Sequence, residues 1–325
     1  MKPLNRRQFL KTIPASALAT SLLALPGSHS RLWGQSESIQ RRFRLCLDHR
    51  LLGIQANVKE LVVLAKNYGF ESIIPNPREL SQFGTLDLEN LLEEMRQSNL
   101  QWGAPGLTVN IRTDSEKEYR RGIDELPKVA EVLGRAGAKR IRTYITPRHN
   151  QLTYRMLFRR YVRRIREVAN ILDDAGLRLG LEYVATRHLR TSGRYTFIFT
   201  LAEMLELIEE TGKSNVGVVL DSFHWHNARE TEADILQLKG SDVIACDLED
   251  APAGIPIDEL TDAPRALPGA TGVIDLETFL GALLQIGYDG PVQVEPMLAE
   301  FRTMPAETVL RQTADSLRQT LLLID

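Results

Sequence analysis

The sequence predicts an α/β protein that folds as a single (β/α)8 barrel behind an N-terminal export segment. From residue 43 onward, short apolar runs alternate with amphipathic stretches, and most of these stretches end at a glycine. The alternation occurs eight times, and strands that alternate with helices form parallel sheets. No low-complexity linker follows residue 36, so the eight units form one domain, and eight parallel strands can close on themselves.

The predicted strands are short aliphatic and β-branched runs, as expected for strands buried on both faces. They cover residues 43–47, 70–75, 100–109, 139–145, 177–184, 216–221, 242–250 and 291–296. In the stretches between them, apolar residues recur at helical spacing. The predicted helices cover residues 58–69, 86–99, 115–137, 153–176, 200–212, 230–240, 275–287 and 306–324. A doubly wound open sheet is the alternative, but no predicted strand leads into the glycine-rich turn of a dinucleotide site.

Residues 1–35 are predicted to be an export signal, which leaves residues 36–325 for the barrel. The run NRRQFLK at 5–11 carries an arginine pair, and the mildly apolar TIPASALATSLLAL follows at 12–25. This order resembles a twin-arginine signal and predicts a periplasmic or other extracytoplasmic location. The apolar stretch is too short for a stable membrane anchor. A basic amphipathic helix is the alternative for this segment.

Removal of the signal would make the domain acidic. The full chain has a formal net charge of −2, and residues 1–35 contain five basic and no acidic side chains, so −7 remains. This charge argues against nucleic acid or anionic lipid as a partner. The arginine-rich stretch at 158–168 has its arginines opposite apolar positions, which is typical of a solvated helix face. The sequence leaves the oligomeric state open, and a homo-oligomer is one of the states left.

The two cysteines, Cys46 and Cys246, do not make a disulfide framework. They fall in the first and seventh predicted strands, which the eighth strand separates in a closed barrel. Their separation is about twice the inter-strand spacing of about 4.8 Å. That distance is beyond the reach of a disulfide, so two free thiols are predicted.

Acidic residues end four consecutive predicted strands. They are Glu182, Asp221, Asp247 (with Asp250 close behind it) and Glu295. In (β/α)8 barrels the C-terminal strand ends form the mouth that holds the active site. Any one of these acids could be a polar loop start, but four converging carboxylates repel one another unless a cation or protons are bound. The pattern therefore predicts a divalent metal site in the mouth.

The second half of the chain resembles the xylose-isomerase-like TIM barrels of the sugar phosphate isomerase/epimerase family. The stretches that carry this resemblance are GLEYV (180–184), GVVLDSFHWH (217–226), DLEDAP (247–252), RALPGATGVIDL (265–276) and GYDGPVQVEP (287–296). Ketose 3-epimerases and inosose dehydratases are members of that family. The first half of the chain contributes only the strand–helix rhythm to the resemblance.

The resemblance implies a divalent-metal site whose ligands are Glu182, Asp221, a third residue and Glu295. At the third position Asp247 stands where the family has a histidine. An all-oxygen set favours Mn²⁺, Mg²⁺ or Ca²⁺ over Zn²⁺; Mn²⁺ is the expected ion, with Mg²⁺ or Co²⁺ as alternatives. His226 could substitute as a nitrogen ligand. Alternatively, the site is weakened and the barrel binds sugars without turning them over.

The resemblance further implies an isomerase or epimerase that acts on a small-molecule carbohydrate, a keto-sugar or related polyol. Glu182 and Glu295 would be the catalytic residues, moving a proton through a metal-bound enediolate. His224, Arg265 and His188 would contact the substrate. A carbon–oxygen lyase, a dehydratase or hydratase with the same site, is the main alternative. A DNA-repair endonuclease with a histidine-rich zinc cluster is disfavoured by the few histidines and the acidic charge.

Overall fold

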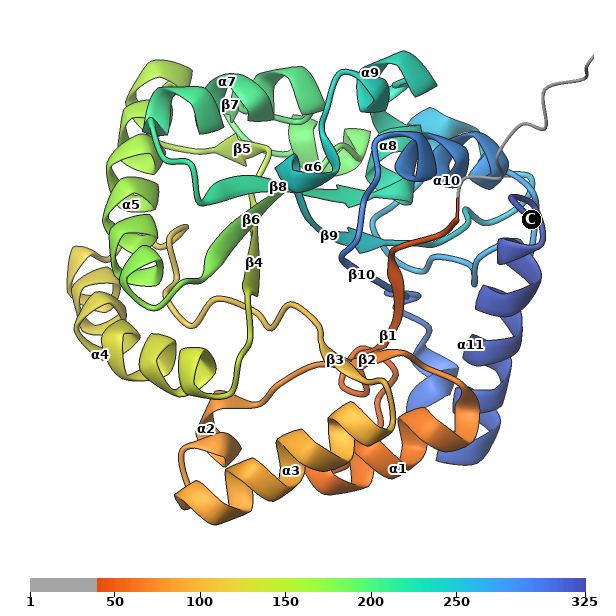
Figure 1. Ribbon diagram of the computed structural model, residues 1–325. Helices are drawn as coiled ribbons and strands as arrows, with labels where there is room; N and C mark the ends of the chain where they lie inside the picture. The colour runs from red at the N-terminus through yellow and green to blue at the C-terminus, as the bar shows by residue number, and fades with distance from the viewer. Residues whose placement is uncertain (1–39) are drawn as a thin grey trace, which may run out of the picture. The chain divides into compact units, whose positions relative to one another are not determined.

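Eight parallel strands form one curled sheet at the centre of residues 40–325, the part of the chain that the computed structural model describes (Figure 1). The strand order is β3-β2-β1-β10-β9-β8-β6-β4. The strands are β1 (Arg44–Leu47), β2 (Ser72–Ile73), β3 (Gln101–Trp102), β4 (Arg140–Ile145), β6 (Arg178–Tyr183), β8 (Val216–Asp221), β9 (Val243–Asp247) and β10 (Pro291–Gln293). The predicted export signal lies outside the described residues.

The two ends of this strand order meet and close the barrel. Gly106, just beyond β3, forms a parallel bridge with Arg142 of β4. The Arg142 N–H donates to the Pro105 carbonyl at 2.9 Å, and the Leu107 N–H donates to the Arg142 carbonyl at 2.7 Å. The prediction of a barrel rather than an open sheet is therefore confirmed.

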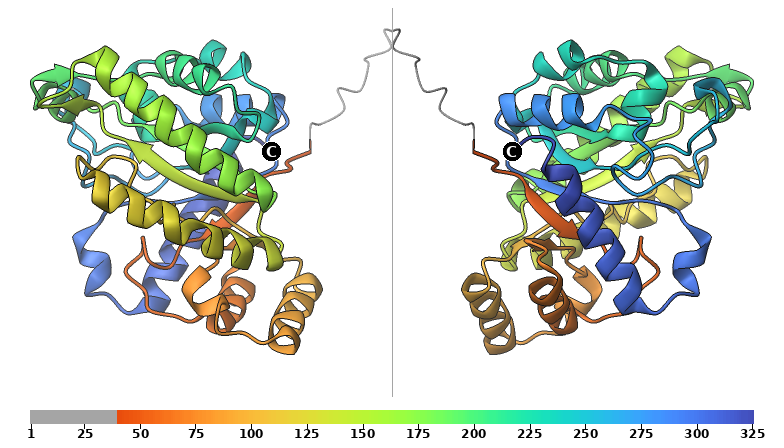
Figure 2. Two further views of the ribbon diagram at one scale, coloured as in Figure 1. Left: turned by 90° about the vertical axis from the view of Figure 1, so that its left-hand side faces the viewer. Right: turned by 90° about the vertical axis from the view of Figure 1, so that its right-hand side faces the viewer.

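A helix follows each barrel strand and covers the outside of the sheet (Figures 1 and 2). These helices are α1 (Val58–Tyr68), α3 (Thr85–Gln97), α4 (Glu116–Arg135), α5 (Tyr154–Asp174), α7 (Leu201–Thr211), α9 (Glu232–Leu236), α10 (Leu276–Gln285) and α11 (Ala306–Leu321). Helix α7 shows why the helix boundaries can be predicted from the sequence. Thr200 and Glu203 form a capping box at its start, and Gly212 ends the helix with φ 61°. Within residues 40–325, no helix combines the length and the apolar character that a bilayer crossing needs.

Small side chains fill the barrel below its mouth. Ala104, Val219 and Ala245 form a buried cluster of their own inside the sheet. A Cβ added to Gly180 would lie 2.8 Å from a methyl group of Val219, and a Cβ on Gly217 would lie 2.3 Å from a backbone oxygen. Larger residues at these positions would clash, because barrel interiors are close-packed. The acids of the next layer therefore stand on a filled, apolar base.

Several short elements in the connecting segments were not predicted. The strands β5 (Arg148–His149) and β7 (Tyr195–Thr196) form an antiparallel pair in the loops after β4 and β6. The others are the helices α2 (Pro77–Leu80), α6 (Arg187–Thr191) and α8 (Ser222–Ala228) and the 3-10 turns η1 (Gly240–Asp242), η2 (Ile257–Glu259) and η3 (Ala299–Arg302). Elements of two to seven residues are too short to show a hydrophobic period, so the sequence gives no sign of them.

Both cysteines are free and buried, as predicted. Cys46 lies on β1 and Cys246 on β9, and β10 separates the two strands. Burial raises the pKa of the Cys46 thiol to about 12. The same cause raises the pKa of Cys246 well above its usual range. Both side chains therefore behave as small apolar groups in the sheet.

Candidate active site

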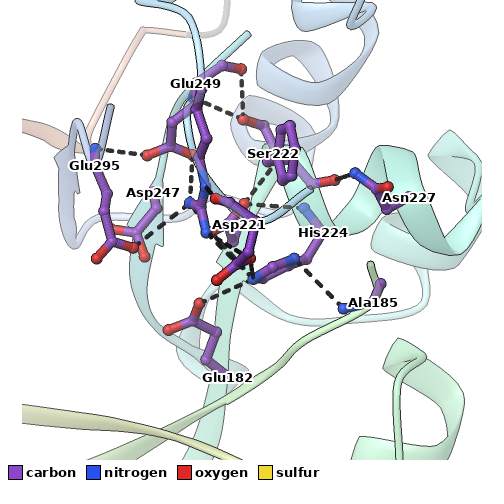
Figure 3. A network of polar contacts seen from close by, with 12 residues as sticks. Glu182, Ala185, Asp221, Ser222, His224, Asn227, Asp247, Glu249 and Glu295 are labelled. Atoms are coloured by element: carbon purple, nitrogen blue, oxygen red, sulfur yellow. Dashed lines mark hydrogen bonds and ion pairs between the residues drawn. The ribbon is translucent and has the colours of Figure 1, made fainter. Parts of the chain in front are cut away.

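Four carboxyl groups meet in the mouth of the barrel (Figure 3). Glu182 comes from the end of β6, Asp221 from the end of β8, Asp247 from the end of β9, and Glu295 follows β10 by two residues. One oxygen of each group lies within 4.8 Å of one oxygen of every other group. The structure thus brings together the four acids that the sequence places at strand ends.

Asp221 both ends β8 and caps helix α8. Its Oδ1 accepts hydrogen bonds from the backbone N–H groups of Phe223, at 2.7 Å, and His224, at 3.0 Å. This is the geometry of an aspartate N-cap, which satisfies amides that a helix start leaves free. The cap fixes the carboxylate, and it places His224 in the first turn of α8 beside the other acids.

Arg142 on β4 reaches across the barrel interior to two of the acids. Its two terminal nitrogens both donate to Asp247, and one of them also donates to Glu182 Oε2 at 2.9 Å. The guanidinium is nearly buried, with 11% of its side chain exposed. Such a bidentate pair with a fully buried carboxylate offsets the cost of removing both charges from water.

Arg265, in the loop after β9, makes the second buried ion pair of the mouth. Its Nη1 donates to Asp221 at 2.8 Å and lies 3.5 Å from Glu295 Oε2. The side chain is 1% exposed. The sequence predicts four further site residues besides the four acids, and Arg265 is one that the structure places in the site, because it also lines the cavity above the acids.

A fifth buried acid, Glu249, supports the site from below. Its Oε1 accepts a hydrogen bond from the backbone N–H of Glu295 at 2.7 Å, which positions that residue (Figure 3). Its backbone is held in turn by the Ser222 hydroxyl, at 2.8 Å from both the Glu249 N–H and its carbonyl. Burial, and then the charge of Asp221, raise the pKa of Glu249 well above its usual range.

The two predicted catalytic acids have raised pKa values. Burial raises the pKa of Glu182 well above its usual range, and the neighbouring Arg142 opposes this shift. Burial raises the pKa of Glu295 to about 7, with Arg265 opposing it. Both shifts follow from the same cause, since desolvation disfavours a carboxylate and the other acids disfavour it further. With a pKa of about 7, Glu295 can exchange protons near neutral pH.

Of the three histidines named from the sequence, only His224 lies at the acids. Its Nε2 is 3.5 Å from Glu182 Oε1 and 3.9 Å from Asp221 Oδ2. Burial lowers the pKa of His224, which favours the neutral imidazole. His226 is two residues further along α8 and belongs to neither group of ligand atoms found among the described residues. His188 is exposed on α6, where Leu189 lines the cavity and His188 does not.

Asp250 is a structural residue rather than part of the site. Its two carboxylate oxygens accept hydrogen bonds from four consecutive backbone N–H groups, at 2.7–3.2 Å. The donors are Thr271, Gly272, Val273 and Ile274. Burial alone would raise the pKa of Asp250, and these hydrogen bonds lower it below its usual value. The loop before α10 is therefore organised around one carboxylate, which explains an acid that the strand-end pattern alone would assign to the mouth.

The donor atoms in the mouth fit a divalent cation in two ways. Glu182, Asp221, Asp247 and Glu295 form an all-oxygen set, and Glu182, Asp221 and His224 form a mixed oxygen and nitrogen set. The first set suits Mg²⁺, Mn²⁺ or Ca²⁺, whereas an imidazole ligand also suits Zn²⁺ or Co²⁺. Arg142 occupies both oxygens of Asp247, so this ligand is shared with a guanidinium.

A cavity of about 810 Å³ opens directly above these groups. Glu182, Glu295, Arg142, Arg265 and His224 line its floor. Most of the remaining lining comes from the loops after β1, β3, β4, β6 and β9 and from the segment after β10. A volume of this size is ordinary for a small-molecule site.

Comparison with known proteins places this architecture in a family. The model of the xylose isomerase-like TIM barrel family matches residues 62–320. The chain therefore belongs to this family, and the resemblance of its strand-end motifs to sugar phosphate isomerases and epimerases is confirmed.

Individual relatives include enzymes of two kinds. An inosose isomerase of Bacillus velezensis is 24% identical over 275 residues, which cover 84% of this chain and 95% of that protein. A 3-dehydroshikimate dehydratase of Pseudomonas putida is 30% identical over 125 residues, 38% of this chain and 19% of that protein. The relatives therefore support an enzyme and leave isomerase and lyase as alternatives.

Solved structures agree on the fold. A xylose isomerase domain protein from Alicyclobacillus acidocaldarius superposes with a TM-score of 0.74 at 29% identity, covering 87% of this chain and 99% of that one. The IolI protein, solved with a bound zinc atom, superposes with a TM-score of 0.71 at 23% identity, covering 86% and 98%.

The residue that sequence reasoning missed in the mouth is Arg142. A signal for it exists, because β4 reads Arg-Ile-Arg-Thr-Tyr-Ile and alternates long polar side chains with buried ones. In a barrel strand one of these faces points inward. Arg140, Arg142 and Tyr144 share that face, and of the three it is Arg142 whose guanidinium reaches the acids.

Proposed function

We propose that this protein is a divalent-metal-dependent isomerase or epimerase of a keto-sugar or related polyol. The observation that carries the proposal is the convergence of Glu182, Asp221, Asp247 and Glu295 within 4.8 Å, beneath a cavity of about 810 Å³. Arg142 and Arg265 supply only two positive charges to these four carboxyl groups, and the excess of carboxyl groups favours a bound cation or bound protons. Membership of a family with an inosose isomerase supports the choice of chemistry.

The same four acids would hold the metal, with His224 as the alternative to Asp247. When bound, the ion supplies Lewis-acid polarisation of a substrate carbonyl and so acidifies the adjacent C–H group. The all-oxygen set favours Mn²⁺, with Mg²⁺ or Co²⁺ as alternatives. The bound zinc atom of the structurally similar IolI protein supports a divalent ion in this fold.

The side chains of this chain would manage the proton. Glu295, whose pKa is raised to about 7, can accept a proton from the carbon beside the carbonyl at neutral pH. Glu182, on the other side of the acid cluster, would hold a proton of its own and donate it to the opposite face of the enediolate, and the two carboxyl groups would then exchange protons with solvent. Arg142 and Arg265 provide fixed positive charge next to the developing oxyanion, where preorganised charge is most effective.

A carbon–oxygen lyase is the second candidate. The 3-dehydroshikimate dehydratase relative matches the chain over 125 residues and favours it. The first step, removal of a proton beside a carbonyl, would be the same in both reactions. They differ afterwards, because a lyase expels a neighbouring hydroxyl as water where an epimerase returns the proton.

Hydrogen exchange in D₂O tests the proposal. The protein, loaded with Mn²⁺, is incubated with D-fructose, with inosose and with related keto-sugars. Deuterium entry at carbon without loss of water supports the isomerase or epimerase, and a new enone absorbance supports the lyase. Absence of both, with the sugars still bound, would show a non-catalytic sugar-binding barrel. The Glu295→Gln variant should abolish exchange, whereas the exposed control Glu307→Gln should keep it.

The export of this protein is a separate proposal that rests on its sequence. The arginine pair Arg6 and Arg7 precedes a short apolar stretch, as in twin-arginine signals. We expect Arg6→Lys with Arg7→Lys to retain the protein in the cytoplasm of a bacterial host. Fractionation of the cells measures this directly.

A further inference from the structure

Five arginines line the cavity, and they differ in what they bind. Arg142 and Arg265 are paired with the buried acids of the floor. Arg50 lies 3.5 Å from Asp48. The remaining two, Arg112 and Arg148, have no carboxylate within salt-bridge distance anywhere in residues 40–325. The cavity therefore has an acidic floor and, higher up, two guanidinium groups without a counter-charge.

Arg112 is held in place by neutral partners only. Its Nη1 donates to the Thr143 hydroxyl at 3.0 Å and to the Tyr144 carbonyl at 3.1 Å. Its guanidinium carbon lies 3.8 Å from the centre of the Tyr144 ring, a cation–π contact. These contacts use one of its three nitrogens and orient the group without neutralising it.

Arg148 is confined by a different device. It lies on β5, where pairing with Thr196 of β7 fixes its backbone. Its aliphatic stem packs on Gly193, because a Cβ added there would lie 2.9 Å from the Arg148 side chain. The glycine makes room for the stem, and the confined arginine loses less entropy when it binds a ligand.

Both arginines line the same cavity as Glu182 and Glu295. Arg112 contacts Thr143 and Tyr144 near the end of β4, and the sheet register pairs Tyr144 with Glu182 of the neighbouring strand β6. Arg148 follows the end of β4 by three residues. A ligand whose carbonyl meets the acids of the floor and that extends along the β4 side of the cavity would therefore bring its far end to Arg112 and Arg148.

We propose that the substrate carries an anionic group, a carboxylate or a phosphate, at the end remote from its carbonyl, and that Arg112 and Arg148 bind this group. This inference rests on the proposed function and names its substrate class. Guanidinium groups match carboxylate and phosphate oxygens in bidentate geometry. The acidic floor repels an anion, so the charge distribution also orients the ligand with its carbonyl inward.

A series of ketoses that differ at C6 tests the inference. D-fructose, D-fructuronate and D-fructose 6-phosphate present a hydroxyl, a carboxylate and a phosphate at the same carbon. Calorimetric titration of the Mn²⁺-loaded protein at fixed ionic strength gives their dissociation constants. At least one of the two anionic ketoses should bind about tenfold or more tightly than D-fructose, since charge-assisted hydrogen bonds contribute about 1.5–3 kcal/mol each. Which of the two binds more tightly distinguishes carboxylate from phosphate.

Two variants and one control assign the preference to these arginines. In the Arg112→Gln, Arg148→Gln double variant, the ratio of the D-fructose constant to that of the preferred anionic ketose should fall toward one. Gly193→Ala, which displaces the Arg148 stem, should lower the same ratio partway. Arg311→Gln changes the net charge equally per substitution at an exposed position on α11 and should keep the wild-type ratio.

Three results would overturn the inference. These are equal affinity for all three ketoses, a preference that survives the double variant, and inorganic phosphate binding as tightly as the sugar phosphate. The proposed function has an independent readout, which is deuterium exchange into D-fructose. Deuterium exchange without a preference for anionic ketoses would overturn only the inference about Arg112 and Arg148. A preference for anionic ketoses without deuterium exchange would overturn only the proposed reaction.

Discussion

The two halves of the barrel contribute mainly opposite charges to the cavity. The ends of β6, β8, β9 and β10 supply the four clustered acids, and the segments from β1 to β5 supply four of the five arginines, Arg50, Arg112, Arg142 and Arg148. Arg265 after β9 and Asp48 after β1 are the exceptions. The recognisable motifs all lie in the acidic half. The difference suggests a division of labour, in which one half performs the common chemistry and the other selects the substrate. Arg142 is the contact at which the halves meet.

The largest effect is expected from breaking the acidic half at Glu295. Glu295→Gln removes the group that we propose accepts the proton, and general base catalysis typically contributes about 10²–10⁴-fold in rate. Deuterium exchange at saturating substrate measures the loss in kcat. A Glu295→Gln enzyme with wild-type exchange would assign the proton transfer elsewhere.

The contact between the halves is broken by Arg142→Leu. This change leaves Asp247 buried without a partner, which costs about 3–5 kcal/mol of stability. Urea unfolding in the presence of a chelator measures it. The double variant Arg142→Leu, Asp247→Leu should recover most of the loss, because it removes both charges. Equal instability of the single and double variants would show that packing, and not charge, is responsible.

Metal binding by the acidic half should depend on pH in a defined direction. Burial raises the pKa of Glu295 to about 7, and a protonated carboxyl cannot ligate. The Glu295 proton should therefore make Mn²⁺ affinity rise by up to tenfold per pH unit below about 7, and the raised pKa of Glu182 should add to this rise. Calorimetry between pH 5.5 and 8 measures this slope. In Glu295→Gln the slope should be shallower, because one titrating ligand is gone.

A smaller effect is expected at Glu230, a carboxyl group outside the acid cluster whose pKa is also raised. Glu230 accepts a hydrogen bond from Tyr183 of β6 and another from the Leu201 N–H at 2.5 Å, and burial raises its pKa to about 7. The folded state thus prefers the protonated form. Wild-type stability should fall by about 1–3 kcal/mol as pH rises from about 4.5 to 7, and Glu230→Gln should flatten this slope. Urea midpoints across that range measure the difference.

The acidic half could be predicted from sequence because strand ends are local features. An apolar run that stops on a carboxylate is visible without knowing the fold, and the barrel then places Glu182, Asp221, Asp247 and Glu295 together. His224 was found for the same reason. His226 follows His224 by two residues on α8 but is not among the atoms that cluster at the acids, and His188 is exposed on the short helix α6.

The basic half could not be predicted in the same way. Arg112 and Arg148 lie in loops whose course depends on contacts far along the chain, such as the pairing of Arg148 with Thr196. The alternation of polar and buried residues in β4 indicates that Arg142 could face inward. That a buried arginine is stable there can be predicted only once its partner Asp247 is known. Asp250 is the opposite case, an acid at a strand end that is not part of the site. The four backbone N–H groups of residues 271–274 that bind it lie 21 to 24 residues later in the chain, so the local sequence does not show its structural role.

The two free thiols make the barrel wall accessible to a simple chemical measurement. Only a thiolate is alkylated readily, and neither Cys46 nor Cys246 can ionise while its strand is in place. Cys46 on β1 and Cys246 on β9 lie on the two strands that pair with β10. The rate of modification by iodoacetamide would therefore report how often β1 and β9 separate from β10. Mass spectrometry would show whether the two cysteines are modified at the same rate or at different rates. Equal rates indicate that the barrel opens as a unit, and unequal rates indicate that it opens between one pair of strands.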